Sequence, residues 1–487
     1  MSNGLNIPPG EILGHPKGLF LLFATEMWER FSYYGMRALL VLTLVAATDQ
    51  ANPGFGLTRS DALSLYGIYT GLVYFTPIIG GWIADNYIGQ RLAVILGGVL
   101  MAAGQFTLFA ATPHSMTLFY FGLGLLIIGN GFFKPNISTM VGDLYPQGDA
   151  RRDAAFSIFY MGINLGAFIA PFVTSTLGED ANYGWRWGYF AAGCGMSLSV
   201  IIQLLLAQRF VGDVGREPGA KRSLAASGGV KQPLTKEERD RLRVVTFLFV
   251  FVTMFWLAFE QAGGLMNIFA ADYTNRMLGT FEVPAGWFQS LNPLYILIFA
   301  PMFAWLWVRM NKVDRNPAAP IKIVMGMLLT AIGFGFLVIG IFQIQHSGDH
   351  KSSMVWLSLA YLFHTLGELC ISPVGLSLMT KLAPLRLASL VMGIWFLMPA
   401  VAQYLGGLVG AFSEHAGEYQ AVRSAAASIG ISVDYSGLLA VFGGIGLTLV
   451  IFSVALWLLS GMLVDWMHGA EKPQKTAVAG RSAINAA

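Results

Sequence analysis

The chain is poor in charge and in cysteine, and both shortages exclude classes of protein. Only 12% of its 487 residues are charged, whereas a soluble domain carries about 25%. A soluble enzyme of two or three domains is therefore not expected. The two cysteines, Cys194 and Cys370, both lie in apolar stretches, which excludes a disulfide scaffold and a cysteine-ligated zinc site. The net charge of +3 gives no reason to expect a nucleic-acid partner.

Long apolar stretches dominate the rest of the sequence. The mean hydropathy is +0.60, and hydrophobic residues make up 55% of the chain. A helix needs about 20 mostly apolar residues to cross a bilayer. We therefore predict an all-α polytopic membrane protein with twelve transmembrane helices. The twelve stretches are residues 17–47, 60–84, 91–112, 116–142, 154–178, 186–208, 242–272, 286–310, 320–342, 354–380, 388–412 and 436–465.

One long polar segment, residues 209–241, divides these spans six and six. Near its end, Thr235 and Glu238 have the spacing of a capping box, so the seventh helix is expected to start in water. This layout is typical of secondary transporters built from two similar bundles. We predict an N-terminal six-helix bundle, a cytoplasmic linker, a C-terminal six-helix bundle and a cytoplasmic tail. Their boundaries are 1–208, 209–241, 242–468 and 469–487.

Basic residues predict the orientation in the membrane, because cytoplasmic loops are enriched in Lys and Arg. With the N-terminus in the cytoplasm, most of the 30 basic residues fall on the inner side. Both termini and the linker are therefore expected in the cytoplasm, in a multi-pass protein of the cell (inner) membrane that is a monomer in the lipid bilayer. Five basic residues fall in the outer loops, namely Arg59, Arg186, Arg276, Lys351 and Arg423.

Seven charged residues lie inside the predicted spans. Each costs about 2.5–3.5 kcal/mol at the centre of a membrane helix. Their burial therefore requires an ion pair, a water-filled cavity or loss of the charge. Four are carboxylates and three are cations, so we expect one carboxylate to hold a proton part of the time, as a proton-coupled carrier requires. The seven are Glu26, Glu29, Arg30, Arg37, Lys134, Glu260 and Glu368.

The first predicted helix carries most of these charges on one face. Glu26, Glu29 and Arg30 are followed by two tyrosines and Arg37 at helical spacing, which gives a single polar stripe that must face a bundle interior. A static salt-bridge network that holds helices together is the structural alternative for the first three. Arg37 lies on the first helix, and Lys134, Glu260 and Glu368 lie on the fourth, seventh and tenth. Charges from both halves can meet only across a central cleft.

Four motifs carry a resemblance to a known family. Residues 26–35 read EMWERFSYYG, residues 156–168 read FSIFYMGINLGAF, and residues 255–261 read FWLAFEQ. These resemble the helix-1, helix-5 and helix-7 motifs of the proton-dependent oligopeptide transporter family. Residues 80–85, GGWIAD, with Arg91 after them, resemble the loop motif of the major facilitator superfamily. These four motifs run from the first to the seventh predicted helix, and the resemblance as a whole extends over helices 1 to 11.

The resemblance implies a major facilitator fold and proton-coupled symport of di- and tripeptides by alternating access, without enzyme activity, cofactor or metal. Carried over to this sequence, Arg37 and Lys134 look like the cations that hold the peptide carboxylate. Glu368 looks like the acid that faces the peptide ammonium. The other expected substrate-binding residues are Asn164, Asn292, Tyr33, Tyr34, Tyr69 and Trp395.

The resemblance also implies a set of proton-coupling residues. Glu26, Glu29 and Glu260 look like the coupling acids, with Arg30 as the partner of the first two. Two ion pairs across the cleft, Arg37–Glu260 and Lys134–Glu368, look like pairs that exchange with the substrate. The chemistry agrees, because a peptide has an anionic and a cationic end, and opposed charges on two walls orient it.

Three alternatives stay open from the sequence. The same fold could carry nitrate or another small organic solute, although a small anion would not need Glu368. An intramembrane enzyme would need a nucleophile–histidine pair or metal ligands at membrane depth. Only His364 lies well inside a predicted span, and no HExxH or GxSxG motif is present. A non-transporting sensor on the same fold is the third alternative.

Overall fold

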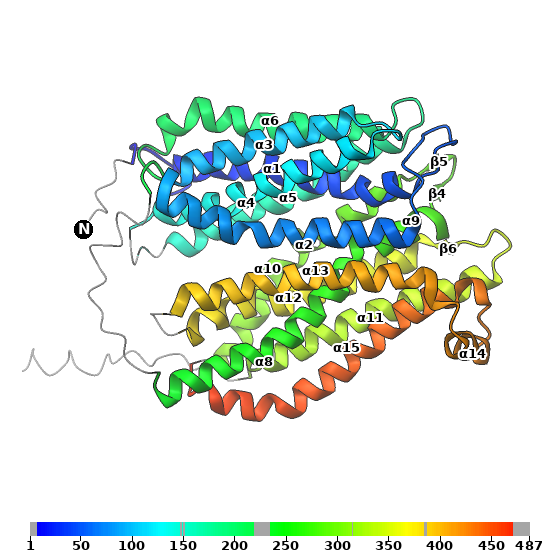
Figure 1. Cartoon of the computed structure of the whole chain (residues 1–487). Coiled ribbons are helices and arrows are strands. Elements are labelled where there is room, and N and C mark those ends of the chain that lie inside the picture. Colours follow the sequence, from blue (N-terminus) through cyan, green and yellow to red (C-terminus); the bar gives the residue numbers. More distant parts are fainter. Residues whose placement is uncertain are drawn as a thin grey trace, which may run out of the picture.

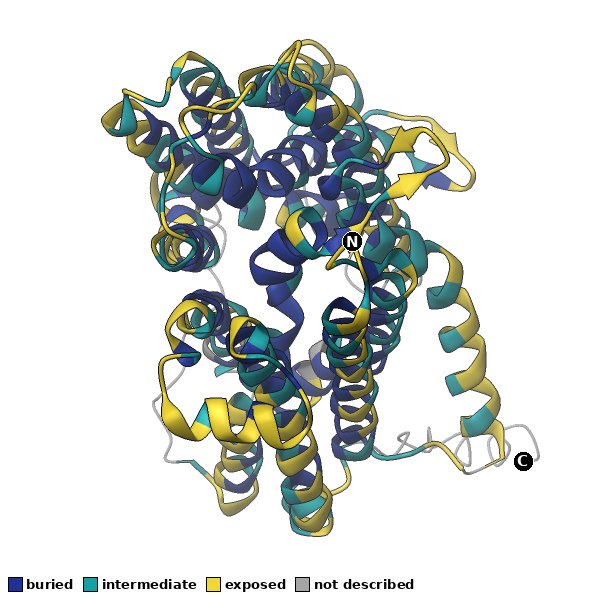
Figure 2. Cartoon of the chain, turned by 90° about the vertical axis from the view of Figure 1, so that its right-hand side faces the viewer, coloured by how far each residue is buried: buried dark blue, intermediate teal, exposed yellow. Residues whose placement is uncertain are grey.

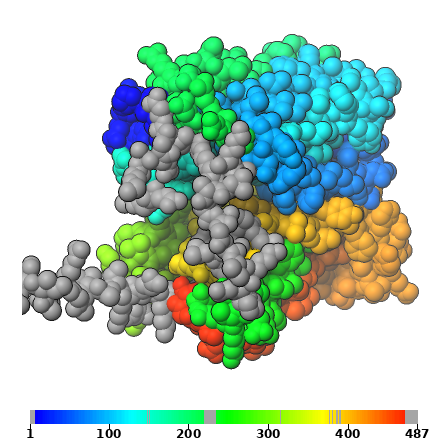
Figure 3. Space-filling view, turned by 60° about the vertical axis from the view of Figure 1, so that its left-hand side comes forward, coloured from blue at the N-terminus to red at the C-terminus, as the bar shows by residue number. Residues whose placement is uncertain are grey.

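The computed structural model describes residues 7–146, 149, 151–218, 234–313, 315–383 and 387–470. Residues 219–233 of the predicted linker and 471–487 of the predicted tail lie outside them. Figure 1 shows two groups of helices, one above the other, with the blue-to-green part of the chain in one group and the green-to-red part in the other. The space-filling view shows the same division (Figure 3). We call the groups the N-terminal half and the C-terminal half.

The N-terminal half consists of long helices that follow the predicted spans closely. A short hairpin of β1 (Glu11–Ile12) and β2 (His15–Pro16) precedes them. A π-helical turn, η1 (Ala84–Ile88), continues the second helix. The helices are α1 (Lys17–Val45), α2 (Arg59–Ile83), α3 (Gln90–Ala110), α4 (Met116–Asp143), α5 (Arg151–Glu179) and α6 (Trp185–Phe210).

The C-terminal half repeats this pattern with more interruptions. Its long helices are α8 (Lys236–Phe259), α10 (Leu291–Lys312), α11 (Ala319–His346), α12 (Met354–Leu382), α13 (Ala388–Ala416) and α15 (Val433–Trp466). Its shorter elements are η2 (Glu260–Gly263), α9 (Leu265–Tyr273), η3 (Ala285–Ser290) and α14 (Gln420–Ser428). Its strands are β3 (Thr274–Asn275), β4 (Met277–Leu278), β5 (Phe281–Glu282) and β6 (Ser352–Ser353).

Within the described residues, 11 helical segments are long and apolar enough to cross a membrane. Only α1 among the predicted spans is missing from this set. It is 29 residues long, so length is not the obstacle. The obstacle is its composition, because it carries four charged residues that are all buried inside the protein. They are Glu26, Glu29, Arg30 and Arg37. The protein is therefore a multi-span membrane protein whose first helix is polar on its packed face.

Local hydrogen bonds set the start of α8. Thr235 precedes α8, and its hydroxyl accepts a hydrogen bond of 3.1 Å from the backbone N–H of Glu238. The Glu238 carboxylate in turn accepts from the backbone N–H of Thr235 at 2.9 Å. The predicted capping box is thus confirmed, and it satisfies two N–H groups that a helix start leaves unpaired.

Two predicted spans are broken in the structure. Residues 242–272 form not one helix but α8, the 3₁₀ turn η2 and α9, with the break at Glu260–Gly264. Residues 286–310 likewise begin as the 3₁₀ turn η3 before α10 starts at Leu291. Hydrophobic periodicity does not reveal such breaks, because a 3₁₀ turn leaves the apolar composition unchanged.

The two halves are tied together at the end that carries β3 to β6 and α14, on the right of Figure 1. Arg59 of α2 pairs with Asp272 of α9 at 2.7 Å. The Glu179 carboxylate at the end of α5 accepts hydrogen bonds from the backbone N–H groups of Ala285 and Gly286, at 2.6 and 2.8 Å. We call this the strand-bearing end.

Buried residues line the facing sides of the helices in both halves, and exposed residues lie mostly on the outer surfaces and loops (Figure 2). The exposed side chains of the long helices include many large apolar ones, such as Leu205 and Leu458. A surface of large apolar side chains is expected for helices that face lipid.

The loop motif between α2 and α3 holds the N-terminal half together at the opposite end. The Arg91 guanidinium donates to the Gln208 side chain at 3.0 Å and to the backbone carbonyl of Val214 at 3.2 Å. Asp85 instead accepts from the Gln90 side chain, also at 3.0 Å. Arg91 thus joins the start of α3 to the segment that follows α6.

Candidate functional site

A buried cluster of two carboxylates and one cation lies within α1. Arg30 donates to both carboxylate oxygens of Glu29, and the bond from its Nη2 measures 2.7 Å. Its Nε also lies 3.3 Å from a Glu26 oxygen. All three side chains are buried, and Glu29 is fully so. Because all three belong to one helix at i, i+3 and i+4, no movement between the halves separates them.

A second ion pair joins the two halves. Arg37 Nη2 of α1 lies 2.6 Å from Glu260 Oε2 of η2, and both side chains are less than a tenth exposed. Arg37 Nε donates to the Tyr66 hydroxyl of α2 at 2.8 Å. The predicted partners Arg37 and Glu260 are therefore in direct contact. A pair of this kind must break if the halves separate around it.

The break in the seventh predicted helix is what allows this contact. A Cβ atom on Gly263 would lie 2.1 Å from the Tyr66 hydroxyl and 2.4 Å from Arg37 Nε. No residue larger than glycine fits there without displacing one of them. The 3₁₀ turn with Gly263 thus brings the C-terminal backbone against α1 and α2 and places Glu260 opposite Arg37.

Lys134 of α4 lies beside the α1 cluster. Its ammonium is 4.0 Å from the centre of the Tyr74 ring, within the range of a cation–π contact. It is also close enough to Glu26, Glu29 and Glu260 for their charges to act on it. Lys134 therefore connects the α1 cluster to the pair between the halves.

Glu368 of α12 has neutral partners. The Asn292 side chain donates to its carboxylate at 2.9 Å and to the Thr365 hydroxyl at 3.0 Å. Asn292 stands in the first turn of α10, just after the 3₁₀ turn η3. Two of the predicted substrate-binding residues, Asn292 and Glu368, are thus in direct contact. Glu260 also lies within electrostatic reach of Glu368.

The predicted pair Lys134–Glu368 is not formed in this structure. Among the described residues, Glu368 meets Asn292 and Lys134 meets the Tyr74 ring, with no ion pair between the two charges. This pair stays a prediction for another conformation.

Of the predicted aromatic wall residues, Tyr33, Tyr69 and Trp395 are buried and Tyr34 is partly buried. The Tyr33 and Tyr34 rings meet edge to face at 5.3 Å, and Arg37 lies over the Tyr34 ring at 5.8 Å. Tyr69 on α2 is 2% exposed. Trp395 is also buried, on α13, and its ring is so close to Gly375 of α12 that a Cβ there would lie 2.2 Å from it.

Asn164 of α5 donates to the backbone carbonyl of Tyr160 at 2.9 Å, within its own helix. Its side chain is 4% exposed. Tyr160 in turn lies within electrostatic reach of Glu368. Among the described residues, Asn164 makes no hydrogen bond to the C-terminal half, so its predicted role in substrate binding stays a prediction.

Sequence reasoning missed four polar residues of this region. Tyr66 binds Arg37, Tyr74 lies under Lys134, Thr365 binds Asn292, and the Asn130 amide reaches Glu29 at 3.5 Å. A signal existed for two of them. Tyr66 precedes the predicted Tyr69 by three residues, and Asn130 precedes Lys134 by four, so each shares a helix face with a predicted residue.

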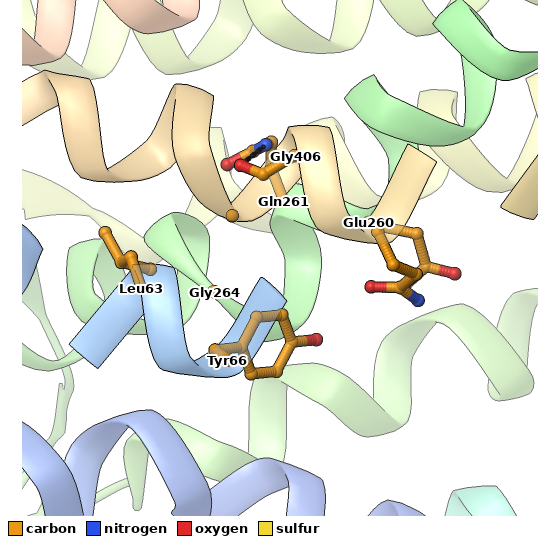
Figure 4. A pocket seen from close by; sticks show the side chains of 8 residues that line it. Leu63, Tyr66, Glu260, Gln261, Gly264 and Gly406 are labelled. Carbon is orange, nitrogen blue, oxygen red and sulfur yellow. Dashed lines mark hydrogen bonds between the residues drawn. The ribbon is translucent and has the colours of Figure 1, made fainter. Parts of the chain in front are cut away.

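Figure 4 shows the small gap around Glu260 where the halves meet. Leu63 and Tyr66 of α2 border it from one side, and Glu260 and Gln261 of η2 border it from the other. Glycines of α13 complete the border, among them Gly406. Glu260 thus sits at a junction of three helical elements, α2, η2 and α13. Among the described residues, no group of three or more His, Cys, Asp or Glu side chains could hold a metal ion.

Comparisons with known proteins agree with this picture. The sequence profile of the POT family matches residues 91–226 and 223–424. The chain is 36% identical over 466 residues to the peptide transporter YePEPT of Yersinia enterocolitica, covering 84% of this chain and 90% of the relative. It is 34% identical over 460 residues to a di-/tripeptide transporter of Lactococcus lactis subsp. cremoris, covering 83% and 91%.

A solved structure shares the fold as well. The crystal structure of a peptide transporter POT in complex with sulfate superposes with a TM-score of 0.82 at 35% sequence identity, over 95% of this chain and 98% of that one. Sequence profile, relatives and fold all lead to the family that the motifs of α1, α5 and α8 indicated. The chain belongs to the POT family of transporters.

Proposed function

We propose that this protein is a proton-coupled symporter that imports di- and tripeptides by alternating access. The observation that carries the proposal is the buried ion pair between Arg37 of the N-terminal half and Glu260 of the C-terminal half. Removing one partner of a buried pair costs about 3–5 kcal/mol, because the other charge stays buried without compensation. The pair can therefore open only if another charge or a proton takes the place of the lost partner.

A peptide and a proton supply those replacements. A peptide carboxylate binds Arg37 in the geometry that arginine prefers for carboxylates, and Glu260 then becomes neutral by taking up a proton. Lys134, which lies among the same charges, is the second cation for the peptide carboxylate. Glu368, held by Asn292, faces the peptide ammonium. Cations on one half and a carboxylate on the other orient a zwitterion.

The remaining predicted residues take the roles that family membership implies. Glu26, Glu29 and Arg30 couple the proton to the cycle together with Glu260. The aromatic walls accept varied side chains, because their contacts with a substrate are largely apolar and nonspecific. These wall and amide residues are Tyr33, Tyr34, Tyr69, Trp395, Asn164 and Asn292.

The architecture of the proposal has twelve transmembrane helices in two six-helix bundles, at residues 1–208 and 242–468, with α1 as the twelfth span. The helix is long enough, and its charges face protein instead of lipid. We further propose that the strand-bearing end faces outward and that both termini and the linker lie in the cytoplasm of a cell with this protein in its inner membrane as a monomer. The positive-inside distribution supports this orientation.

The cross-half contacts indicate the conformational state. The bonds of Arg59 with Asp272 and of Glu179 with Ala285 and Gly286 close the strand-bearing end. In the proposed orientation this conformation is closed to the outside. A chain with these ties broken would admit peptide from that side.

The test is uptake of labelled di-alanine into proteoliposomes under an imposed inward proton gradient, with and without an uncoupler. We expect accumulation above the external concentration that the uncoupler abolishes. Unlabelled nitrate in excess should leave the uptake unchanged, and unlabelled dipeptide should suppress it. Competition by nitrate with no competition by dipeptide would favour the alternative cargo, a small anion or other solute.

A further inference from the structure

Gln403 on α13 is a buried amide with no hydrogen-bond partner. Its side chain is 1% exposed, and neither its amide oxygen nor its amide nitrogen is bonded to any part of the chain that the structure describes. The neighbouring Gln261 is different, because its amide donates to the backbone carbonyl of Gly406 at 2.8 Å. A buried amide without partners destabilises the conformation that holds it. Such a residue needs an explanation in function or in another conformation.

The position of Gln403 supplies such a functional explanation. Gln403 borders the same gap as Glu260, Tyr66 and Gln261. Figure 4 labels these three neighbours. Gln403 therefore lines the same junction as Glu260, whose carboxylate would lose its partner if Arg37 moved away. No other described glutamine or asparagine side chain that borders this gap is without a partner.

This gap lies on a seam between the halves. Gly67 of α2 and Gly407 of α13 touch so closely that a Cβ on Gly67 would lie 2.8 Å from the Gly407 Cα. The Gln403 backbone carbonyl faces the same glycine, 3.1 Å from that Cβ position. The seam joins one helix of each half, so it has to loosen whenever the halves rock apart. The surroundings of the Gln403 amide then change together with those of Glu260.

A carboxamide suits a carboxyl group that changes its protonation state. Its nitrogen donates to an ionised carboxylate, and its oxygen accepts from a protonated one. An aliphatic side chain could do neither, and a cation could do only the first. A glutamine at this place can therefore hold Glu260 in both forms.

We propose that Gln403 is a positioning residue for the coupling step: it has no partner while Arg37 holds Glu260, and it binds the Glu260 carboxyl group when Arg37 turns to the peptide carboxylate. The inference rests on the proposed function. It predicts that the amide is dispensable for the stability of the present conformation and needed for the cycle that couples peptide movement to protons.

The test uses Gln403→Met, which keeps the length and approximate volume of the side chain and removes the amide. Gln203→Met is the matched control, because Gln203 is equally buried but lies on α6 and donates to the Thr25 hydroxyl at 3.1 Å. For the full-length proteins, three quantities are measured: thermal stability in detergent, counterflow exchange of di-alanine in proteoliposomes, and gradient-driven accumulation.

We expect Gln403→Met to melt at or above the temperature of the wild type, because it removes an unpartnered amide. The ratio of gradient-driven accumulation to exchange should fall about tenfold, the factor of one hydrogen bond to a charged group. Gln203→Met should melt at a lower temperature, since it loses a hydrogen bond, and keep the wild-type ratio. Gln403→Leu, which also lacks the amide, should reproduce the fall in the ratio if the methionine variant expresses poorly.

Three results would overturn the inference. A lower melting temperature for Gln403→Met would mean that the amide has a partner in the present conformation. A wild-type ratio in both Gln403 variants would mean that it takes no part in coupling. A wild-type protein that fails to accumulate di-alanine would overturn the proposed function and this inference with it, whereas the first two results leave the proposed function standing.

Discussion

The two buried ion-pair systems of the molecule differ in what they connect. The cluster of Glu26, Glu29 and Arg30 lies on one helix, so its spacing is set by the helical repeat and does not depend on contact between the halves. The pair of Arg37 and Glu260 joins α1 to η2 across the seam between the halves. The first system can hold a proton whatever the distance between the halves. Only the second system forms when the halves are together and breaks when they separate. A coupled carrier needs both.

Breaking the first system should have the largest effect. Glu29→Gln keeps the shape of a fully buried side chain but removes a carboxylate whose two oxygens both accept from Arg30. Gradient-driven accumulation of di-alanine should be lost, because the amide cannot take up or release a proton. Counterflow exchange, which needs no net proton movement, should continue. Undiminished accumulation would show that Glu29 has no coupling role.

Breaking the second system should affect substrate binding and stability together. Arg37→Ala removes a charged contact to the peptide carboxylate, so uptake should weaken by about a hundredfold. It also leaves Glu260 buried without its cation, at a cost of about 3–5 kcal/mol. The double variant Arg37→Ala/Glu260→Ala should regain part of the lost thermal stability, because the two side chains are in direct contact.

Arg91→Ala is the control for Arg37→Ala. It removes an arginine that bonds to Gln208 and Val214, far in sequence from the charged pair and within the N-terminal half. Its loss should lower stability without changing the affinity for peptides relative to other substrates. Equal losses of peptide uptake in the two variants would make Arg37 a structural residue.

Glu368 sharpens the comparison, because it is a buried carboxylate held by neutral groups. Glu368→Gln should weaken the uptake of peptides with a free amino terminus by about tenfold, the value of one charged hydrogen bond. Peptides acetylated at the amino terminus have no ammonium to lose, so their uptake should change less. Competition assays with paired free and acetylated dipeptides measure this difference. Equal losses for both classes would reverse the proposed orientation of the substrate.

The smallest effect on stability is expected for an arginine–carboxylate pair at the surface of the protein, outside the predicted spans. Arg151 donates to Asp149 with bonds of 2.8 and 3.1 Å between α4 and α5. These bonds hold the pKa of Asp149 below its usual value. The stabilisation is therefore present at neutral pH and fades as the pH falls through this lowered pKa, because the carboxylate then becomes protonated.

Asp149→Asn should accordingly lower the melting temperature at pH 7 by at most about 2 °C, since exposed pairs contribute little. The difference between the variant and the wild type should shrink at about pH 3, below the ordinary Asp pKa of about 3.9, because the unfolded chain there takes up a proton more readily than the paired carboxylate does. Melting curves at the two pH values test this. A difference that grows in acid would mean that the pair does not act through the charge of Asp149.

Several features of the site followed from single helices. The polar stripe of α1 was predictable because Glu26, Glu29 and Arg30 repeat at the helical period, and their pairing in the structure needs nothing but that helix. The capping box of α8 was predictable for the same reason, since Thr235 and Glu238 are three residues apart. The motifs of the three helices led to the family that the comparisons then showed.

Other features depended on packing between distant segments. Tyr66 could not be assigned to Arg37 from a separation of 29 residues. The Gly263–Gly264 pair was a signal for the turn at Glu260, but the apolar run on both sides of it masked the break. The pairing of Lys134 with Glu368 was predicted from the resemblance, but the described residues do not form it, because Glu368 accepts from Asn292 instead. In the present state Lys134 lies on the Tyr74 ring.

The sequence by itself determined which segments form long apolar helices and which face of α1 is polar, because hydropathy and the helical repeat act on each segment separately. The resemblance implied the pair of Arg37 and Glu260, but only the tertiary structure decided the turn that brings them together and the place of the unpartnered Gln403 amide at the same gap. Both depend on how closely two halves of the chain approach. That distance is a property of the packed conformation, where a glycine such as Gly263 has room for no side chain.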